Sequence, residues 1–150
     1  MAEARVLVVD DEINQGRSLA IGLKLEGFDV ETAIDATAAL RTLEGEGGRG
    51  CDVAILDLML PGMNGIELAR EIGRRWPATR VVLTSAYHLS ERQLLRADCG
   101  VVGFVPKPYR LDELVAFLRS KLSKTPDSCR RLLSGEPFEH VTHRTRAGIR

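Results

Sequence analysis

Acidic, hydroxyl and amino side chains end four of the apolar, β-branched runs in this sequence. Asp10 and Asp11 end the first run, Asp57 the third, Thr84 the fourth and Lys107 the fifth. In a parallel sheet with helices on both faces, ligands bind beyond the carboxyl ends of the strands. If the runs are strands of that kind, three carboxylates, a hydroxyl group and an ammonium group lie together at one edge of the sheet.

The grouping of carboxylates predicts a metal site. Carboxylates held close together repel one another, and they stay ionised near neutral pH only when a cation lies among them. A few carboxylate oxygens, with coordination positions left for water or phosphate, suit Mg²⁺ better than other common ions. We therefore expect Asp10, Asp11 and Asp57 to bind Mg²⁺.

The same residues are suited to phosphoryl transfer. A divalent cation, an ammonium group and a hydroxyl group together stabilise the charge on a phosphoryl group in transit. One carboxylate can then act as the nucleophile and become an acyl phosphate. Asp57 is best placed for this role because it ends the central run, while Lys107 and Thr84 would contact phosphoryl oxygens.

The elements that must position these residues follow a regular alternation. Five strand-like runs are separated by segments of helical period, which predicts βαβ units and a parallel five-stranded sheet. Runs one, three and four are nearly continuous Val, Ile and Leu, as in central strands, whereas residues 28–31 alternate as in an edge strand. The runs start at Arg5, Phe28, Val53, Arg80 and Val102.

Polar and glycine residues mark where the intervening helices begin and end. Asn64 followed by Glu67, and Ser90 followed by Gln93, both have the spacing of a capping box at a helix start. The glycine-rich residues 45–48 are expected to form a flexible segment after the second helix.

Several short strings in the sequence resemble one known family. VLVVDDE, LDLMLPGMNG, LTSA and GFVPKPY, in this order and spacing, closely resemble the receiver domain of bacterial two-component response regulators. The resemblance covers residues 4–123 and implies a flavodoxin-like (βα)5 fold, a doubly wound parallel sheet of strand order 2-1-3-4-5. It also implies Mg²⁺-dependent transfer of a phosphoryl group to Asp57 from the phosphohistidine of a sensor histidine kinase or His-phosphotransfer protein.

The resemblance implies further roles for single residues. The backbone carbonyl of Met59 would bind the metal. Thr84 and Phe104 match a switch pair, in which the hydroxyl group moves toward the phosphoryl group and the aromatic ring turns inward. On the sequence alone, Phe104 is equally consistent with a core residue. The Lys107–Pro108 peptide bond matches one that is cis in the family.

Three other functions compete with a phosphoacceptor. A small-molecule phosphatase or phosphotransferase with an Asp nucleophile usually has a cap that encloses its substrate, and the connections here are short. A nucleotide- or flavin-binding module needs a Gly/Ser/Thr-rich phosphate cradle where this chain has Asp10-Asp11-Glu12. An inactive scaffold would not need the complete set of site residues. We therefore expect a signalling module and not an enzyme, with only self-catalysed phosphotransfer and autodephosphorylation.

Composition sets the broad class of the chain. With 150 residues, 44% of them hydrophobic and 28% charged, it has the balance of a globular domain. No apolar run approaches the roughly 18 to 20 residues of a membrane span, and the start of the chain has no signal-peptide pattern, so we expect a cytoplasmic protein. Cys51, Cys99 and Cys129 lack the spacing of a disulfide framework or a zinc site.

The last part of the chain differs from the rest. An amphipathic helix is expected over residues 111–122, and residues 124–150 then show no apolar period. Residues 1–123 carry three more acidic than basic side chains, and residues 124–150 carry three more basic than acidic ones. We therefore predict a receiver domain at 1–123 and a basic tail at 124–150 that has no domain of its own and could dock on the receiver.

The sequence of the tail also bears on which partners we expect. Residues 124–150 show no helix-turn-helix pattern, which argues against direct binding to DNA. We expect signalling through contact with an unidentified downstream protein or through phosphate relay. A homodimer linked to phosphorylation is left open.

Overall fold

A computed structural model describes residues 3–86 and 100–123 of the chain. Five parallel strands form one sheet in the order β2-β1-β3-β4-β5. This is the flavodoxin-like order expected from the sequence, with β2 at one edge as predicted and β5 at the other. The strands are β1 (Arg5–Val9), β2 (Asp29–Ala33), β3 (Val53–Asp57), β4 (Arg80–Ser85) and β5 (Gly103–Pro106).

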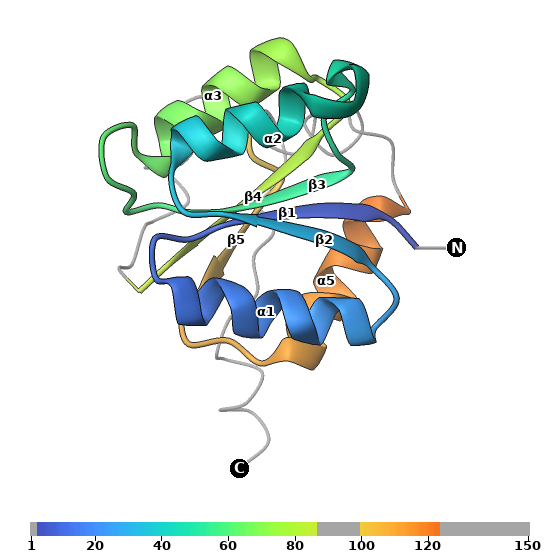
Figure 1. The fold of residues 1–150 in the computed structure, drawn as a ribbon. Coiled ribbons are helices and arrows are strands. Elements are labelled where there is room, and N and C mark those ends of the chain that lie inside the picture. Colours follow the sequence, from blue (N-terminus) through green and yellow to red (C-terminus); the bar gives the residue numbers. More distant parts are fainter. Residues whose placement is uncertain (1–2, 87–99, 124–150) are drawn as a thin grey trace, which may run out of the picture.

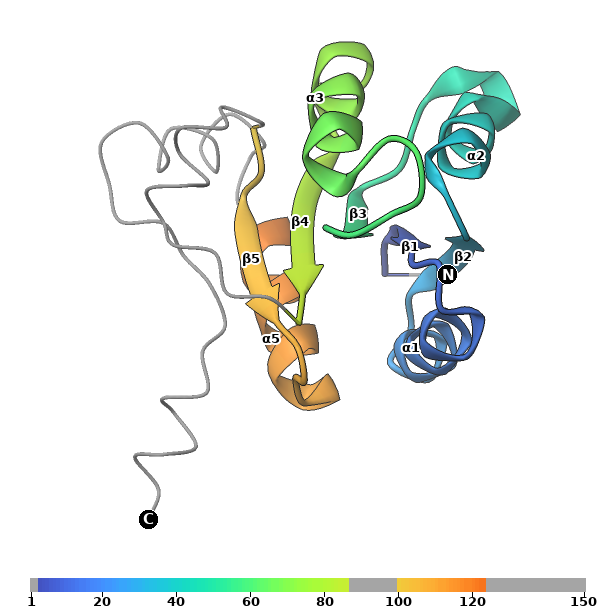
Figure 2. The same cartoon turned by 90° about the vertical axis from the view of Figure 1, so that its left-hand side faces the viewer.

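Helices cover both faces of the sheet (Figures 1 and 2). On one face lie α2 (Ala36–Gly48) and α3 (Gly65–Arg75), and on the other lie α1 (Ile13–Leu25) and α5 (Leu111–Leu122). The helix expected after Ser90 and the tail expected at 124–150 lie outside the described residues. None of the described helices is both long enough and apolar enough to cross a membrane.

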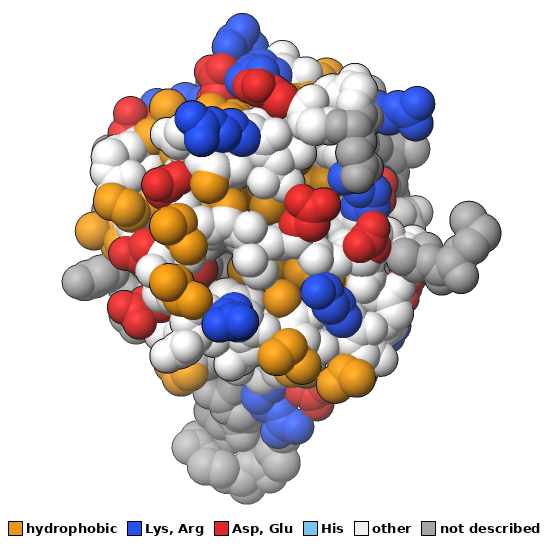
Figure 3. All heavy atoms as spheres, in the orientation of Figure 1, with side chains coloured by type: hydrophobic (Ala, Val, Ile, Leu, Met, Phe, Trp, Pro, Cys, Tyr) orange, Lys and Arg blue, Asp and Glu red, His pale blue; other side chains and the backbone are white. Residues whose placement is uncertain are grey.

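The core forms one layer on each side of the sheet. Side chains of β1, β3 and β4 alternate between the two layers, and nearly all of them are buried, which explains the nearly continuous apolar runs. Exposed apolar side chains are scattered among charged ones on the face shown in Figure 3. Leu7, Leu56 and Leu83 face α2 and α3, whereas Val8, Ile55 and Val82 face α1 and α5.

Helix α2 extends further than the sequence predicted. Its start is capped by Asp35, whose Oδ1 accepts a hydrogen bond of 2.8 Å from the Ala38 N–H. Residues 45–48, expected to form a flexible segment after the helix, are part of the helix itself. Gly47 and Gly48 at its end have positive φ values of 87° and 69°, which glycine adopts without strain, and Trp76 Nε1 donates a hydrogen bond of 2.7 Å to the Gly48 carbonyl.

Helix α3 begins directly against the end of β3. The predicted cap is present, since Asn64 Oδ1 accepts a hydrogen bond of 2.9 Å from the Glu67 N–H. Gly65 follows, and a Cβ atom there would lie 2.5 Å from the Asp57 carbonyl oxygen and 2.8 Å from the Leu58 Cα. A side chain at this position would collide with backbone, so the close approach requires glycine.

Strand register brings the predicted site residues to one level. Asp57, the last residue of β3, pairs with Thr84 of β4. Asp10 directly follows β1 and Lys107 directly follows β5. Successive side chains of a strand alternate between the two faces of the sheet. By this alternation, all four residues fall on the face that α1 and α5 cover.

Candidate functional site

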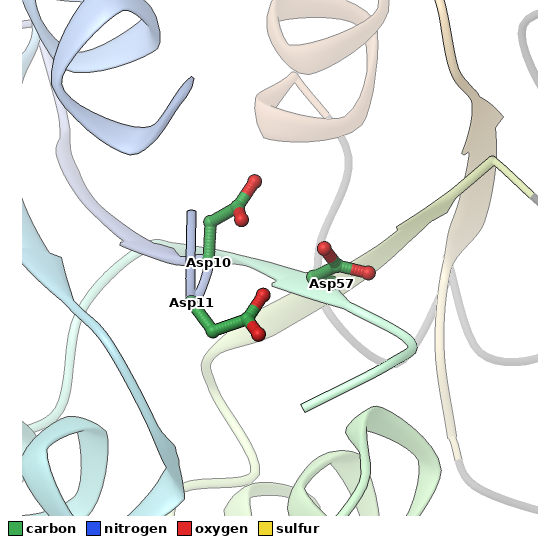
Figure 4. Close-up of side chains that lie close together, drawn as sticks. All are labelled: Asp10, Asp11 and Asp57. Atoms are coloured by element: carbon green, nitrogen blue, oxygen red, sulfur yellow. The ribbon is translucent and has the colours of Figure 1, made fainter. Parts of the chain in front are cut away.

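Three carboxylates come together at the C-terminal edge of the sheet (Figure 4). Asp10 and Asp11 lie between β1 and α1, and Asp57 ends the neighbouring strand β3. One oxygen of each carboxylate lies within 4.8 Å of the corresponding oxygen of the other two. Asp10 and Asp57 are buried, whereas Asp11 is exposed. The structure therefore brings together the three residues predicted to bind metal.

Backbone amides orient the two buried carboxylates. The Glu12 N–H donates a hydrogen bond of 2.9 Å to Asp10 Oδ1, and the Met59 N–H donates one of 3.0 Å to Asp57 Oδ1. Each carboxylate is thus held by the loop that follows its own strand. The second oxygen of each remains available to other groups.

Lys107 connects these second oxygens. Its Nζ lies 3.0 Å from Asp10 Oδ2 and 3.1 Å from Asp57 Oδ2. Burial by itself lowers the pKa of the Lys107 ammonium group, but the hydrogen bonds and charges of the two aspartates outweigh burial and raise that pKa above its ordinary value. Lys107 is therefore charged at neutral pH and neutralises part of the cluster. The Lys107–Pro108 peptide bond is cis, as the resemblance implied.

Gln15 belongs to the site, although the sequence reasoning missed it. Its Oε1 accepts a third hydrogen bond from Lys107 Nζ, at 3.0 Å. A signal for it existed, because a helix that starts just after Asp11 presents its first turn to the same edge of the sheet. Glutamine is common on exposed helix faces, so its type alone did not distinguish it.

The predicted switch residues lie on neighbouring strands. The Thr84 hydroxyl is buried and donates a hydrogen bond of 3.4 Å to the Leu56 carbonyl. Phe104 is buried in the core on the α2–α3 side of the sheet, next in sequence to Val105, which pairs with Thr84. Met59, the predicted carbonyl ligand, has an exposed side chain and contacts Asp57 through its backbone.

A groove of about 660 Å³ opens beside the carboxylates, between α1 and the loop that joins β5 to α5. Lys107 forms part of its wall, together with amide groups of Asn14 and Gln15 and the hydroxyl groups of Ser18 and Tyr109. Burial raises the pKa of the Tyr109 phenol, which therefore stays protonated at neutral pH. The groove is thus lined by one cation, by neutral polar residues and by the apolar residues Leu19, Ala86, Pro108 and Leu111.

The donor set of the cluster fits Mg²⁺. Carboxylate oxygens are the hard ligands that this ion prefers, and two oxygens bound to one Mg²⁺ lie at most about 4.2 Å apart. The three oxygens that lie within 4.8 Å of one another would need only a small side-chain movement to meet that limit. Asp10, Asp11 and Asp57 are therefore the residues that could hold the ion.

Comparison with known proteins identifies the family. The model of the response regulator receiver domain family matches residues 6–119. The chain is 35% identical over 130 residues to the DNA-binding response regulator MtrA of Mycolicibacterium paratuberculosis, covering 87% of this chain and 56% of MtrA. A CheY-like receiver domain protein from Methanospirillum hungatei JF-1 superposes with a TM-score of 0.71 at 27% identity, over 85% of this chain and 96% of that one.

A solved structure of NtrX from Brucella abortus gives a TM-score of 0.72 at 32% identity, over 88% of this chain and 30% of that one. The chain therefore belongs to the receiver domain family of two-component response regulators. It spans about half the length of the curated relatives that it matches, for example 56% of MtrA.

These relatives correct one prediction. The sequence of residues 124–150 argued against direct binding to DNA, yet MtrA, at 35% identity, is a DNA-binding response regulator. That prediction is therefore wrong. It rested on the absence of a helix-turn-helix pattern in a short segment. Because this chain spans only part of such relatives, residues 124–150 do not show how those relatives bind DNA.

Proposed function

We propose that Asp57 is the phosphoacceptor of this receiver domain, and that Asp10, Asp11 and Asp57 bind the Mg²⁺ on which phosphorylation depends. The observation that supports this most strongly is the bridge that Lys107 forms between Asp10 and Asp57. It brings the nucleophile, one further acidic ligand and a positive charge into contact, and one oxygen of Asp11 lies within 4.8 Å of oxygens of both aspartates. A phosphoryl group on Asp57 would meet that positive charge at once.

In the proposed reaction, a carboxylate oxygen of Asp57 attacks the phosphorus of a phosphohistidine on a histidine kinase or phosphotransfer protein. The new O–P bond forms as the N–P bond breaks, and the bonding electrons return to the imidazole nitrogen. Bound Mg²⁺ supplies positive charge that neutralises phosphoryl oxygens. Lys107 contributes a second positive charge, and the backbone carbonyl of Met59 would be a further ligand of the ion.

Thr84 and Phe104 are proposed to transmit the change. The hydrogen bond from the Thr84 hydroxyl to the Leu56 carbonyl is long, at 3.4 Å. A hydrogen bond to a charged phosphoryl oxygen is stronger than one to a carbonyl, so phosphorylation favours movement of this hydroxyl toward Asp57. Phe104 is proposed to respond to this movement through the backbone, because it precedes Val105, which pairs with Thr84.

The remaining features of the proposal concern the chain as a unit. Residues 1–123 act as the receiver domain, and 124–150 as a tail. The module works in the cytoplasm, where response regulators generally act. It signals through its phosphorylated state and does not turn over small phosphate esters.

The decisive experiment is phosphorylation of the full chain by acetyl phosphate with Mg²⁺, followed by intact mass. We expect one added phosphoryl group, its loss when EDTA replaces Mg²⁺, and none on Asp57→Asn. A matched control is Asp52→Asn, because Asp52 accepts a hydrogen bond from the Arg5 N–H at the opposite end of the strands and should not affect phosphorylation. A folded wild-type chain that stays unmodified, or an Asp57→Asn chain that is modified equally, would refute the proposal.

A further inference from the structure

We propose that Gln15 is a positioning residue that holds the Lys107 ammonium group in the site while Asp57 gains a phosphoryl group. This inference rests on the proposed function, and it adds a residue that neither the family resemblance nor the comparisons assign. Gln15 acts on the phosphoryl group only through Lys107.

The hydrogen bonds of Lys107 carry the inference. An ammonium group has three N–H donors and no acceptor. Lys107 Nζ directs three contacts of nearly equal length, at 3.0 Å to Asp10 Oδ2, 3.1 Å to Asp57 Oδ2 and 3.0 Å to Gln15 Oε1. All three donors therefore have a partner, and Gln15 is the uncharged one.

Phosphorylation changes the two charged partners but not the neutral one. Once Asp57 carries a phosphoryl group, its carboxylate charge is gone, so Lys107 must exchange its bond to Asp57 for one to a phosphoryl oxygen. A cation bound to Asp10 would also weaken the attraction between Asp10 and the Lys107 ammonium group. The Gln15 amide keeps the same acceptor strength throughout, so it tethers the ammonium group while the other two contacts change.

The position of Gln15 suits such a tether. It is the third residue of α1, a helix anchored by buried residues on its inner face, among them Gly16, Leu19 and Ala20. A Cβ at Gly16 would lie only 3.8 Å from the Asp10 Cβ, so this turn of the helix lies directly against the site. Gln15 itself is exposed and lines the groove beside Lys107.

The test is a kinetic one, on the full chain with Mg²⁺ and acetyl phosphate. Gln15→Met removes the acceptor and keeps the side-chain length. A net hydrogen bond of ordinary strength predicts a fall in the phosphorylation rate of about three- to tenfold. Mg²⁺ affinity should stay within about twofold of wild type, because Gln15 contacts Lys107 and is not one of the three clustered carboxylates. Asn14→Met, in the same groove wall, is the matched control and should phosphorylate at the wild-type rate.

A double mutant separates positioning from a purely structural role. In a Lys107→Met background, Gln15→Met should have no further effect, because the residue through which it acts is gone. Equal slowing in both backgrounds, or a wild-type rate for Gln15→Met alone, would overturn the inference. Failure of the proposed function has a different result, in which wild type and Asn14→Met also take no phosphoryl group.

Discussion

At the scale of single residues, the site places like charges together. Asp11 is exposed, but one of its oxygens lies within 4.8 Å of oxygens of Asp10 and Asp57. Lys107 bridges only the two buried carboxylates, so the charge of Asp11 adds repulsion to the metal-free fold. A functional arrangement of this kind lowers stability until a cation binds.

Removing one of these charges should therefore stabilise the metal-free protein. We expect Asp11→Asn to raise the free energy of unfolding by about 0.5 to 1 kcal/mol without Mg²⁺, and to weaken the stabilisation that Mg²⁺ provides. Urea unfolding with and without Mg²⁺ measures both effects. Asp29→Asn, on the exposed edge strand β2, is the control and should change stability by less than about 0.5 kcal/mol. A less stable Asp11→Asn protein in EDTA would contradict the expectation.

Cys51 illustrates a partly buried group whose titration affects stability. Its Sγ donates a hydrogen bond of 3.2 Å to the Val53 carbonyl, and burial raises the pKa of its thiol to about 12, from an ordinary value of 9.0. The folded state therefore keeps the proton that the unfolded chain loses above about pH 9. The contribution of this thiol to stability is full below that pH and is lost as the pH rises from about 9 through about 12.

The direction of this pH dependence can be measured in a Cys99→Ser/Cys129→Ser background, in which Cys51 is the remaining thiol. Between about pH 8 and pH 10, the free energy of unfolding should fall more steeply with Cys51 present than in the Cys51→Val variant. The folded protein should also react much more slowly than the unfolded chain with an aromatic disulfide reagent. Parallel pH profiles for the two proteins would rule out a raised thiol pKa.

At the scale of elements, one glycine controls how α3 meets the site. Gly65 lies against the backbone of Asp57 and Leu58, so Gly65→Ala would push α3 away from the segment that orients the phosphoacceptor. We expect a loss of about 1 to 3 kcal/mol in the free energy of unfolding and slower phosphorylation.

Gly73→Ala is the matched control, since it lies in the same helix and its added Cβ would have no atom from outside the local helix backbone within 4 Å. It should stabilise the protein by about 0.5 to 1 kcal/mol, because alanine favours helix. Urea unfolding measures the free energy of unfolding of both variants. Equal changes in the two would contradict the claim that the close backbone contact at position 65 requires glycine.

The sequence predicted elements well where local signals and packing agree. The parallel sheet and the grouping of polar residues at one edge followed from apolar runs that end in charged or hydroxyl residues. The strand order followed from the family resemblance, and the cap at Asn64 from its spacing to Glu67. The extent of α2 did not follow, because the contact from Trp76 that holds its glycine-rich end comes from a residue far along the chain. Gln15 was missed for a similar reason, since its partner, Lys107, is 92 residues away.

At the scale of the whole molecule, the described residues form an apolar core on each face of the sheet. Among the described residues, both apolar clusters are made from residues between Ala4 and Leu122. Helix α5 completes the cluster on the α1 side, and Arg119 joins its end to Glu3 by hydrogen bonds of 2.9 to 3.2 Å. We propose that residues 124–150 lie outside this packing.

A chain that ends at Ser123 should accordingly fold and accept a phosphoryl group at the wild-type rate. Its free energy of unfolding should lie within about 0.5 kcal/mol of the full chain, because no described core side chain is lost. A chain that ends at Arg110 removes α5, exposing the apolar surface that Leu114 and Leu118 now bury, and should lose cooperative unfolding. Urea unfolding and intact mass after acetyl phosphate treatment measure both outcomes. A loss above about 1 kcal/mol for the longer chain would mean that residues 124–150 are part of the domain.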